Sequence, residues 1–238
     1  GVELLAWDDT AAVAAAIAEA DAILVSIPPA AGRDPALARY GAALGRARPR
    51  WVGYLSTTGV YGDRQGGWVD ETGALAPVSE RGRWRVAAEQ AWLATGLPVH
   101  LFRLAGIYGP GRSALDKLRA GRAQRIVKPG QVFSRIHVDD IAAALLASLA
   151  RPDPGRAYNL ADDEPAPPQD VIAHAARLLG LPPPPEVPFE AADLSPMARS
   201  FYAESKRVAN RRIKQELGLR LAWPDYRAGL AGLLAAGF

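Results

Sequence analysis

The sequence predicts an α/β fold with a parallel sheet and a smaller carboxyl-terminal lobe. Short apolar runs alternate with helical patterns at the spacing of βα units, which favours parallel strands. One of these runs, Trp51–Leu55, ends in three consecutive hydroxyl residues, Ser56, Thr57 and Thr58. Ligands of open parallel sheets bind beyond the carboxyl ends of the strands, so this cluster is the first candidate for a site.

Composition narrows the class of protein. The chain has 238 residues, of which 49% are hydrophobic and 22% charged, as in an ordinary globular protein. A net charge of +3 is too small to indicate nucleic-acid binding, and the lack of cysteine excludes disulfides and thiolate metal sites. No long apolar run and no His/Asp/Glu cluster with metal-ligand spacing occurs. We therefore expect a cytoplasmic protein with no signal peptide and no membrane, nucleic-acid or metal partner.

The first half of the chain reads as four strands separated by helices. Strands are expected at 2–6, 22–27, 51–55 and 98–104, and helices at 11–20, 34–47 and 80–95. Asp9 can cap the first helix, and Asp34-Pro35 is a typical start for the second. Gly96 is a typical stop for the third. A polar loop is expected at 62–77.

The second half is less regular. After a loop at 106–111 we expect helices at 114–120, 141–150, 168–179, 205–217 and 224–236, and strands at 125–127, 132–136, 157–160 and near Val187. Asp139 or Asp140 can cap the helix at 141–150, and Gly180 can end the helix at 168–179. These short elements suit a lobe over the edge of the sheet.

Five strings occur in the order found in one known family: LSTTGVYG at 55–62, FRLAGIYGPG at 102–111, RIHVDDI at 135–141, YNLADD at 158–163, and the segment 205–224. The chain thus resembles the extended short-chain dehydrogenase/reductases, the NAD-dependent epimerase/dehydratase family. The resemblance implies a Rossmann-like doubly wound parallel sheet with a small carboxyl-terminal substrate lobe. Residues 1–115 would form the NAD(P)-binding core. Within 116–238, residues 133–161 would return to that core and the remainder would form the lobe.

The same resemblance implies a cofactor, NAD or NADP, and a small-molecule substrate such as a nucleotide sugar. Thr57 would hydrogen-bond the reacting oxygen. The residues implied for the cofactor are Asp8, Ser26, Ile27, Pro28, Leu55, Ser56, Leu104, Ala105 and Ile107. Those implied for the substrate are Thr58, Tyr61, Gly106 and His137. A monomer or homodimer is expected.

Two features depart from the family pattern. The sequence has no Gly-x-x-Gly-x-x-Gly loop, and we expect it to begin at the family's third strand, with the first βαβ unit missing. The family's catalytic tyrosine and lysine, four residues apart on a helix, align with Arg81 and Arg85. Arginine stays protonated and only donates hydrogen bonds, so it cannot serve as the base, although two arginines could clamp an anion.

Each candidate has a structural alternative. The hydroxyl of Thr57 could merely satisfy a turn amide, and the two arginines could form a solvated helix face. Tyr61 could be packing, His137 a structural residue beside a helix cap, and Asp70-Glu71 a solvated pair. A literal Tyr-x-x-x-Lys match at Tyr202–Lys206 lies over a hundred residues too late for the family pair.

Two classes of function follow. The first is an NAD(P)-binding oxidoreductase or epimerase with a degenerate catalytic pair. The second is a non-catalytic dinucleotide sensor or interaction protein of the same fold, which the missing pair favours. Whether the chain is an enzyme stays open at this point. A third interpretation, nucleic-acid binding through grouped arginines, would predict a steep salt dependence.

Overall fold

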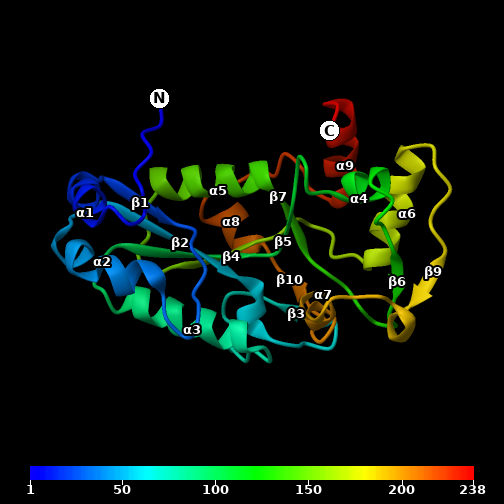
Figure 1. The fold of residues 1–238 in the computed structure, drawn as a ribbon, viewed down its shortest axis with the longest axis horizontal. Coiled ribbons are helices and arrows are strands. Elements are labelled where there is room, and N and C mark those ends of the chain that lie inside the picture. The colour runs from blue at the N-terminus through cyan, green and yellow to red at the C-terminus, as the bar shows by residue number, and fades with distance from the viewer.

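A computed structural model describes residues 1–238. Its central sheet has four strands in the order β1 (Ala22–Val25), β2 (Trp51–Thr57), β4 (Val99–Leu104) and β8 (Ala157–Leu160) (Figure 1). All neighbouring pairs are parallel, with Thr57 opposite Leu104 and Leu104 opposite Leu160. The predicted α/β fold with a parallel sheet is confirmed, and the strands end along one edge.

Helices cover both faces of the sheet. α2 (Pro35–Arg46) and α3 (Glu80–Leu93) pack on one face, in a core that includes Tyr40, Tyr54 and Trp92. α5 (Val138–Ala150) packs on the other face, against Trp51 and Phe102. α1 (Thr10–Glu19) lies beside α2 and has no buried residue. Figure 1 shows the sheet between α5 and α3, the arrangement of a doubly wound fold.

The remaining elements are mostly short, apart from α6 and α9. They are η1 (Thr58–Tyr61), β3 (Trp68–Val69), β5 (Gly106–Tyr108), α4 (Ala114–Arg119), β6 (Arg125–Val127), β7 (Arg135–His137), α6 (Pro168–Leu178), β9 (Glu186–Pro188), η2 (Phe189–Ala191), α7 (Pro196–Phe201), β10 (Arg207–Val208), α8 (Arg211–Gln215) and α9 (Tyr226–Ala235). Three two-stranded ladders, β5–β7, β6–β9 and β3–β10, join segments far apart in the sequence. α4, α6 and α9 share a core of their own around Leu115 and Leu230.

The strand predicted at 2–6 is wrong. These residues form no ladder, and the side chains of Val2 and Leu4 are each 89% exposed. A strand needs a neighbour to satisfy its backbone groups, and β1 pairs only with β2. An apolar run alone therefore does not make a strand.

Four differences lie in the less regular part. The helix predicted at 205–217 is divided into β10 and α8, because residues 207–208 pair with β3 inside the supposed 62–77 loop. The loop predicted at 106–111 begins as β5, paired with β7. The strand predicted at 132–136 shifts to 135–137, because Val132 donates its amide to Ser205 Oγ instead of a ladder. α7 was not predicted, although Ser195-Pro196 is an ordinary helix start.

The structure contains no helix both long and apolar enough to cross a membrane.

Candidate functional site

The hydroxyl of Thr57 lies at the carboxyl end of β2, where the strand gives way to η1. Its Oγ1 accepts a hydrogen bond from the Gly59 amide at 3.1 Å, so Thr57 caps this short helix. The side chain remains partly exposed, and its O–H has no acceptor within the protein. Thr57 therefore fills the structural role weighed as the alternative and still has one donor left for a ligand. Thr58, the next residue, is buried.

Arg85 lies on α3 beside the end of β2. Its Nη1 donates to Leu55 O at 2.8 Å and to the Tyr54 hydroxyl at 3.0 Å. Burial raises the pKa of Tyr54 to about 12, against the opposing charge of Arg85, so the phenol stays neutral. These two bonds fix the guanidinium two residues before Thr57. Arg81, one turn earlier on α3, is exposed.

The other strand ends predicted for a cofactor lie along the same edge. Ser26, Ile27 and Pro28 follow β1, and Leu104 ends β4 opposite Thr57. The next residues, Ala105 and Gly106, lead into β5, and Gly106 is exposed. Ile107, within β5, is partly buried. The fold thus brings these predicted residues to one edge of the sheet.

Ser56 belongs to a buried polar network rather than to the open edge. Its hydroxyl donates to Glu89 on α3, and Glu89 pairs with Arg103 of β4 at 2.8 Å. Burial disfavours the charged form of Arg103, but its hydrogen bonds and charge pairing with Glu89 outweigh burial and raise its pKa. A buried pair of this kind fixes α3 against the sheet.

Tyr61 continues this network. Its hydroxyl accepts a bond from Arg103 Nη1 at 2.9 Å and donates to Asn159 Oδ1 at 2.7 Å. The residue is fully buried, and burial raises the pKa of its phenol. Asn159 Nδ2 in turn donates to Ala209 O, near the end of the chain. Tyr61 packs inside the molecule and presents no surface to a substrate, which corrects the expectation that it lines the site.

The side chain of Glu71 is also buried, contrary to the expectation of a solvated loop pair. Its Oε1 accepts a hydrogen bond from the Asn159 amide at 2.8 Å, and only 4% of its side chain is exposed. Burial raises the pKa of this carboxyl. Because β8 is the last strand of the sheet, Glu71 satisfies an amide on the sheet's free edge. Asp70, beside it, accepts bonds from Thr72.

His137 and Asp8 take roles in local structure. His137 is 1% exposed; its Nδ1 accepts the Asp139 amide and so caps α5. Burial lowers the pKa of this imidazole, which stays neutral at pH 7. The ring is enclosed between Tyr108 and Trp223, so His137 presents almost no surface to a substrate, which corrects that expectation. Asp8 is exposed and pairs with Arg39 at 3.0 Å.

The sequence reasoning missed Arg135 and Asp162, which lie in two of the quoted strings. Arg135 is the residue opposite Gly106 in the β5–β7 ladder and donates from Nη1 to Phe133 O and Ala166 O. Asp162 follows β8, is 1% exposed, and has no partner for either carboxylate oxygen. Burial raises the pKa of Asp162 to about 8, against the charge of Arg135. The only feature of the sequence that could have pointed to Asp162 is its position just after a predicted strand.

Comparison with known proteins identifies the family. A model of the NAD dependent epimerase/dehydratase family matches residues 38–161. The chain belongs to this family. It is 32% identical to Protein YeeZ of Escherichia coli (strain K12) over 222 residues, 88% of this chain and 74% of YeeZ.

Solved structures share the fold of this epimerase/dehydratase chain. A functionally unknown conserved protein from Silicibacter pomeroyi DSS is 62% identical, with a TM-score of 0.88 over 90% of this chain and 77% of that one. The dTDP-glucose 4,6-dehydratase DesIV from Streptomyces venezuelae, solved with NAD, is 19% identical with a TM-score of 0.76. The match covers 95% of this chain and 76% of the DesIV chain. At this identity the likeness shows only that the two proteins share the Rossmann-like fold.

Within this epimerase/dehydratase chain the late Tyr-x-x-x-Lys match serves the lobe. The ring of Tyr202 packs against Phe133 and Phe189. Lys206 Nζ donates to Gly62 O at 2.9 Å and to the Glu204 carboxylate. Both side chains are nearly buried, and Lys206 ties the carboxyl-terminal segment to the turn after η1.

Proposed function

We propose that this protein binds NAD or NADP and acts as an oxidoreductase or epimerase on a hydroxyl or carbonyl group of a small molecule, with nucleotide sugars as the substrate class. The observation that carries the proposal is the free O–H of Thr57 at the open strand edge, with the Arg85 guanidinium held two residues away. Family membership and the NAD-bound dehydratase DesIV support it.

The strand ends suit the nicotinamide end of a dinucleotide. Gly106 is exposed, so its backbone is accessible to a ligand, and a Cβ at this position would lie 3.3 Å from Ser134 O, close enough to disturb the contact with β7. Ser26, Ile27 and Pro28 border the same edge. When bound, the nicotinamide ring supplies a hydride acceptor or donor.

The side chains at the edge would position the substrate and stabilise charge. Thr57 donates its O–H to the substrate oxygen. Arg85, with Arg81 one turn away, stabilises negative charge that develops on that oxygen. Neither arginine can take the proton, since both stay protonated. The proton is therefore exchanged with water or another side chain.

A substitution pair at Thr57 tests the proposal. Thr57→Ala removes the donor, and we expect turnover of a sugar-nucleotide substrate, followed by NAD(P)H absorbance, to fall by about 10²-fold or more. Thr57→Ser keeps the hydroxyl and should keep most of the activity. Arg81→Tyr combined with Arg85→Lys, which restores the family pair, should raise turnover. Equal turnover in Thr57→Ala and the unmodified protein would remove Thr57 from the mechanism.

A second candidate function is dinucleotide binding without catalysis. The structural roles of Thr57 and Arg85 favour this function. Thr57 already caps η1, and Arg85 already donates hydrogen bonds to Tyr54 and Leu55. A sensor of this kind would bind NAD(P) and would show no turnover even after the family pair is restored. The combined arginine variant therefore distinguishes the two functions.

A further inference from the structure

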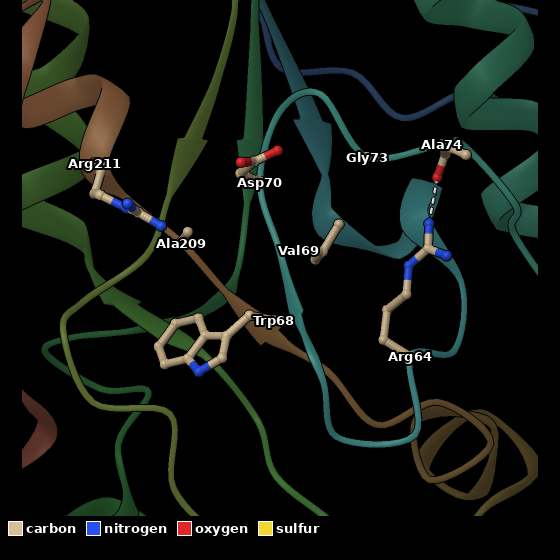
Figure 2. Close-up of a pocket in the computed structure, with 8 residues that line it drawn as sticks. All are labelled: Arg64, Trp68, Val69, Asp70, Gly73, Ala74, Ala209 and Arg211. Carbon is tan, nitrogen blue, oxygen red and sulfur yellow. Dashed lines mark hydrogen bonds between the residues drawn. The ribbon is translucent and has the colours of Figure 1, made fainter.

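The structure contains a hollow of about 320 Å³ to which none of the strand-end residues contributes. Its lining includes Arg64, Trp68, Val69, Asp70, Ala209 and Arg211 (Figure 2). One wall comes from the loop after η1 together with β3, and the other from Ala209, which follows β10, and Arg211, which begins α8. The volume lies within the range of small-molecule sites.

Backbone hydrogen bonds hold the two walls together. The amides of Arg64 and Gly66 both donate to Ser205 O, at 3.0 and 2.9 Å. The Ala209 amide donates to Val69 O at 2.9 Å, which continues the β3–β10 ladder. Val69 and Ala209 are buried and form the floor. The hollow is therefore built by paired segments and is formed before any ligand arrives.

The hollow offers cationic donors that the protein leaves unused. Arg64 is fixed by a bond from Nη2 to Ala74 O at 2.5 Å, visible in Figure 2. Its Nε is enclosed and out of reach of a ligand, which leaves Nη1 as its free donor. Arg211 is exposed and belongs to none of the ion pairs in the structure. Asp70 uses Oδ1 for Thr72, at 2.9 Å to its amide, which leaves Oδ2 to accept a bond.

An aromatic face completes the set. Trp68 is 62% exposed. Among the aromatic residues, only Phe201 is equally exposed. An indole in water is a platform on which a planar ring can stack. This set of groups matches a planar nitrogen heterocycle that carries a phosphate. The indole can stack on the ring, the two guanidinium groups can bind the phosphate, and the free carboxylate oxygen can accept a bond from the ring.

We propose that this hollow is a second ligand site, which binds a nucleotide with its base stacked on Trp68 and its phosphate between Arg64 and Arg211. Asp70 Oδ2 accepts a hydrogen bond from an amino group of the base. The nucleotide can be free or part of a larger molecule such as a dinucleotide. The site is separate from the strand edge and does not depend on the function proposed there.

The test is a calorimetric titration of the full chain with AMP, adenosine, inorganic phosphate and NADH. We expect AMP to bind more tightly than adenosine or phosphate, because each of these lacks one half of the recognised group. Trp68→Ala and Arg211→Ala should each weaken AMP binding by about tenfold, the scale of one lost base stack or one charge-assisted contact. No binding of AMP, or AMP binding that is unchanged in both Trp68→Ala and Arg211→Ala, would overturn the proposal.

Arg119→Ala is the matched control, because Arg119 is an exposed arginine on α4 outside the hollow. Arg119→Ala should leave the affinity for AMP unchanged. Thr57→Ala tests whether the hollow is independent of the strand edge, and it should also leave the affinity for AMP unchanged. Phosphate binding as tight as AMP would overturn the proposal in favour of a simple anion site. A single-stranded oligonucleotide that binds far more tightly than AMP, with a steep salt dependence, would overturn it in favour of nucleic-acid binding.

Discussion

Asp162 and Thr57 are polar residues at the carboxyl ends of two strands of the same sheet, β8 and β2, but their surroundings are opposite. Thr57 caps η1 and keeps one donor open to solvent. Asp162 is enclosed, and neither of its oxygens has a partner. Burying a carboxyl group in this way disfavours its ionised form, which explains a pKa near 8 in the folded protein.

The Asp162 carboxyl should make stability depend on pH. Its pKa is raised from 3.8 in the unfolded chain to about 8, so between these values the folded state binds more protons. The contribution of the protonated Asp162 carboxyl to the free energy of unfolding is fully present below pH 4. It is lost as pH rises towards 8. We expect Asp162→Asn, which stays neutral, to be more stable than the unmodified protein at pH 8, by an amount on the order of a few kcal/mol.

Urea unfolding of both proteins at pH 5 and pH 8 measures this. The gap in unfolding free energy between Asp162→Asn and the unmodified protein should be larger at pH 8. An equal gap at both pH values would mean that Asp162 is ionised in the folded state, paired with Arg135.

At the scale of elements, the turn from β2 through η1 depends on Gly62. This residue has φ of 69°, and a Cβ would lie 1.8 Å from Ala76 O. The turn brings the loop at 62–77 back over η1 and places Lys206 against Gly62 O. The strand that ends in Thr57 therefore leads directly into a turn that only glycine can make.

Gly62→Ala should lower the free energy of unfolding by about 3 kcal/mol or more, because left-handed strain and steric overlap with backbone act together. Gly96→Ala is the control. Gly96 also has a positive φ, 73°, but nothing lies within 4 Å of its Cβ position, so only the strain of about 1 kcal/mol applies. Urea denaturation compares them, and equal losses would show that the contact with Ala76 relaxes freely.

At the scale of the whole molecule, long-range polar contacts join the carboxyl-terminal segment to the sheet. Asn159 of β8 bonds both Tyr61 and Ala209, and Glu71 bonds the Asn159 amide. Figure 1 shows α8 beside the sheet, whereas α9 lies away from it with α4 and α6. We propose that 1–115 and 133–161 form the cofactor core and that the rest is the substrate lobe.

A thermal shift with NAD, NADH, NADP and NADPH tests ligand binding by the whole chain. A ligand that binds only the folded state stabilises it by about 2.7 kcal/mol at a hundredfold excess over Kd. We expect at least one dinucleotide to raise Tm in the Arg211→Ala background, where the second site is weakened. No shift with any of the four would contradict cofactor binding by this chain.

The sequence alone determined the parallel α/β class, most helix positions and the family, because hydrophobic periodicity, caps and short strings are local. It also placed Thr57 at a strand end. Only the tertiary structure decided which polar groups are open. Ser56, Tyr61 and Glu71 are buried by partners from other elements, and Arg85 is fixed by β2.

The apolar run at 2–6 and the polar loop at 62–77 show the physical reason. The first has the composition of a strand but no partner, whereas Trp68–Val69 forms a ladder with a segment about 140 residues later. Strand pairing depends on which segments lie side by side in the folded protein. The local pattern of residues does not indicate which segments these are. The hollow beside Trp68 exists only because those two segments pair.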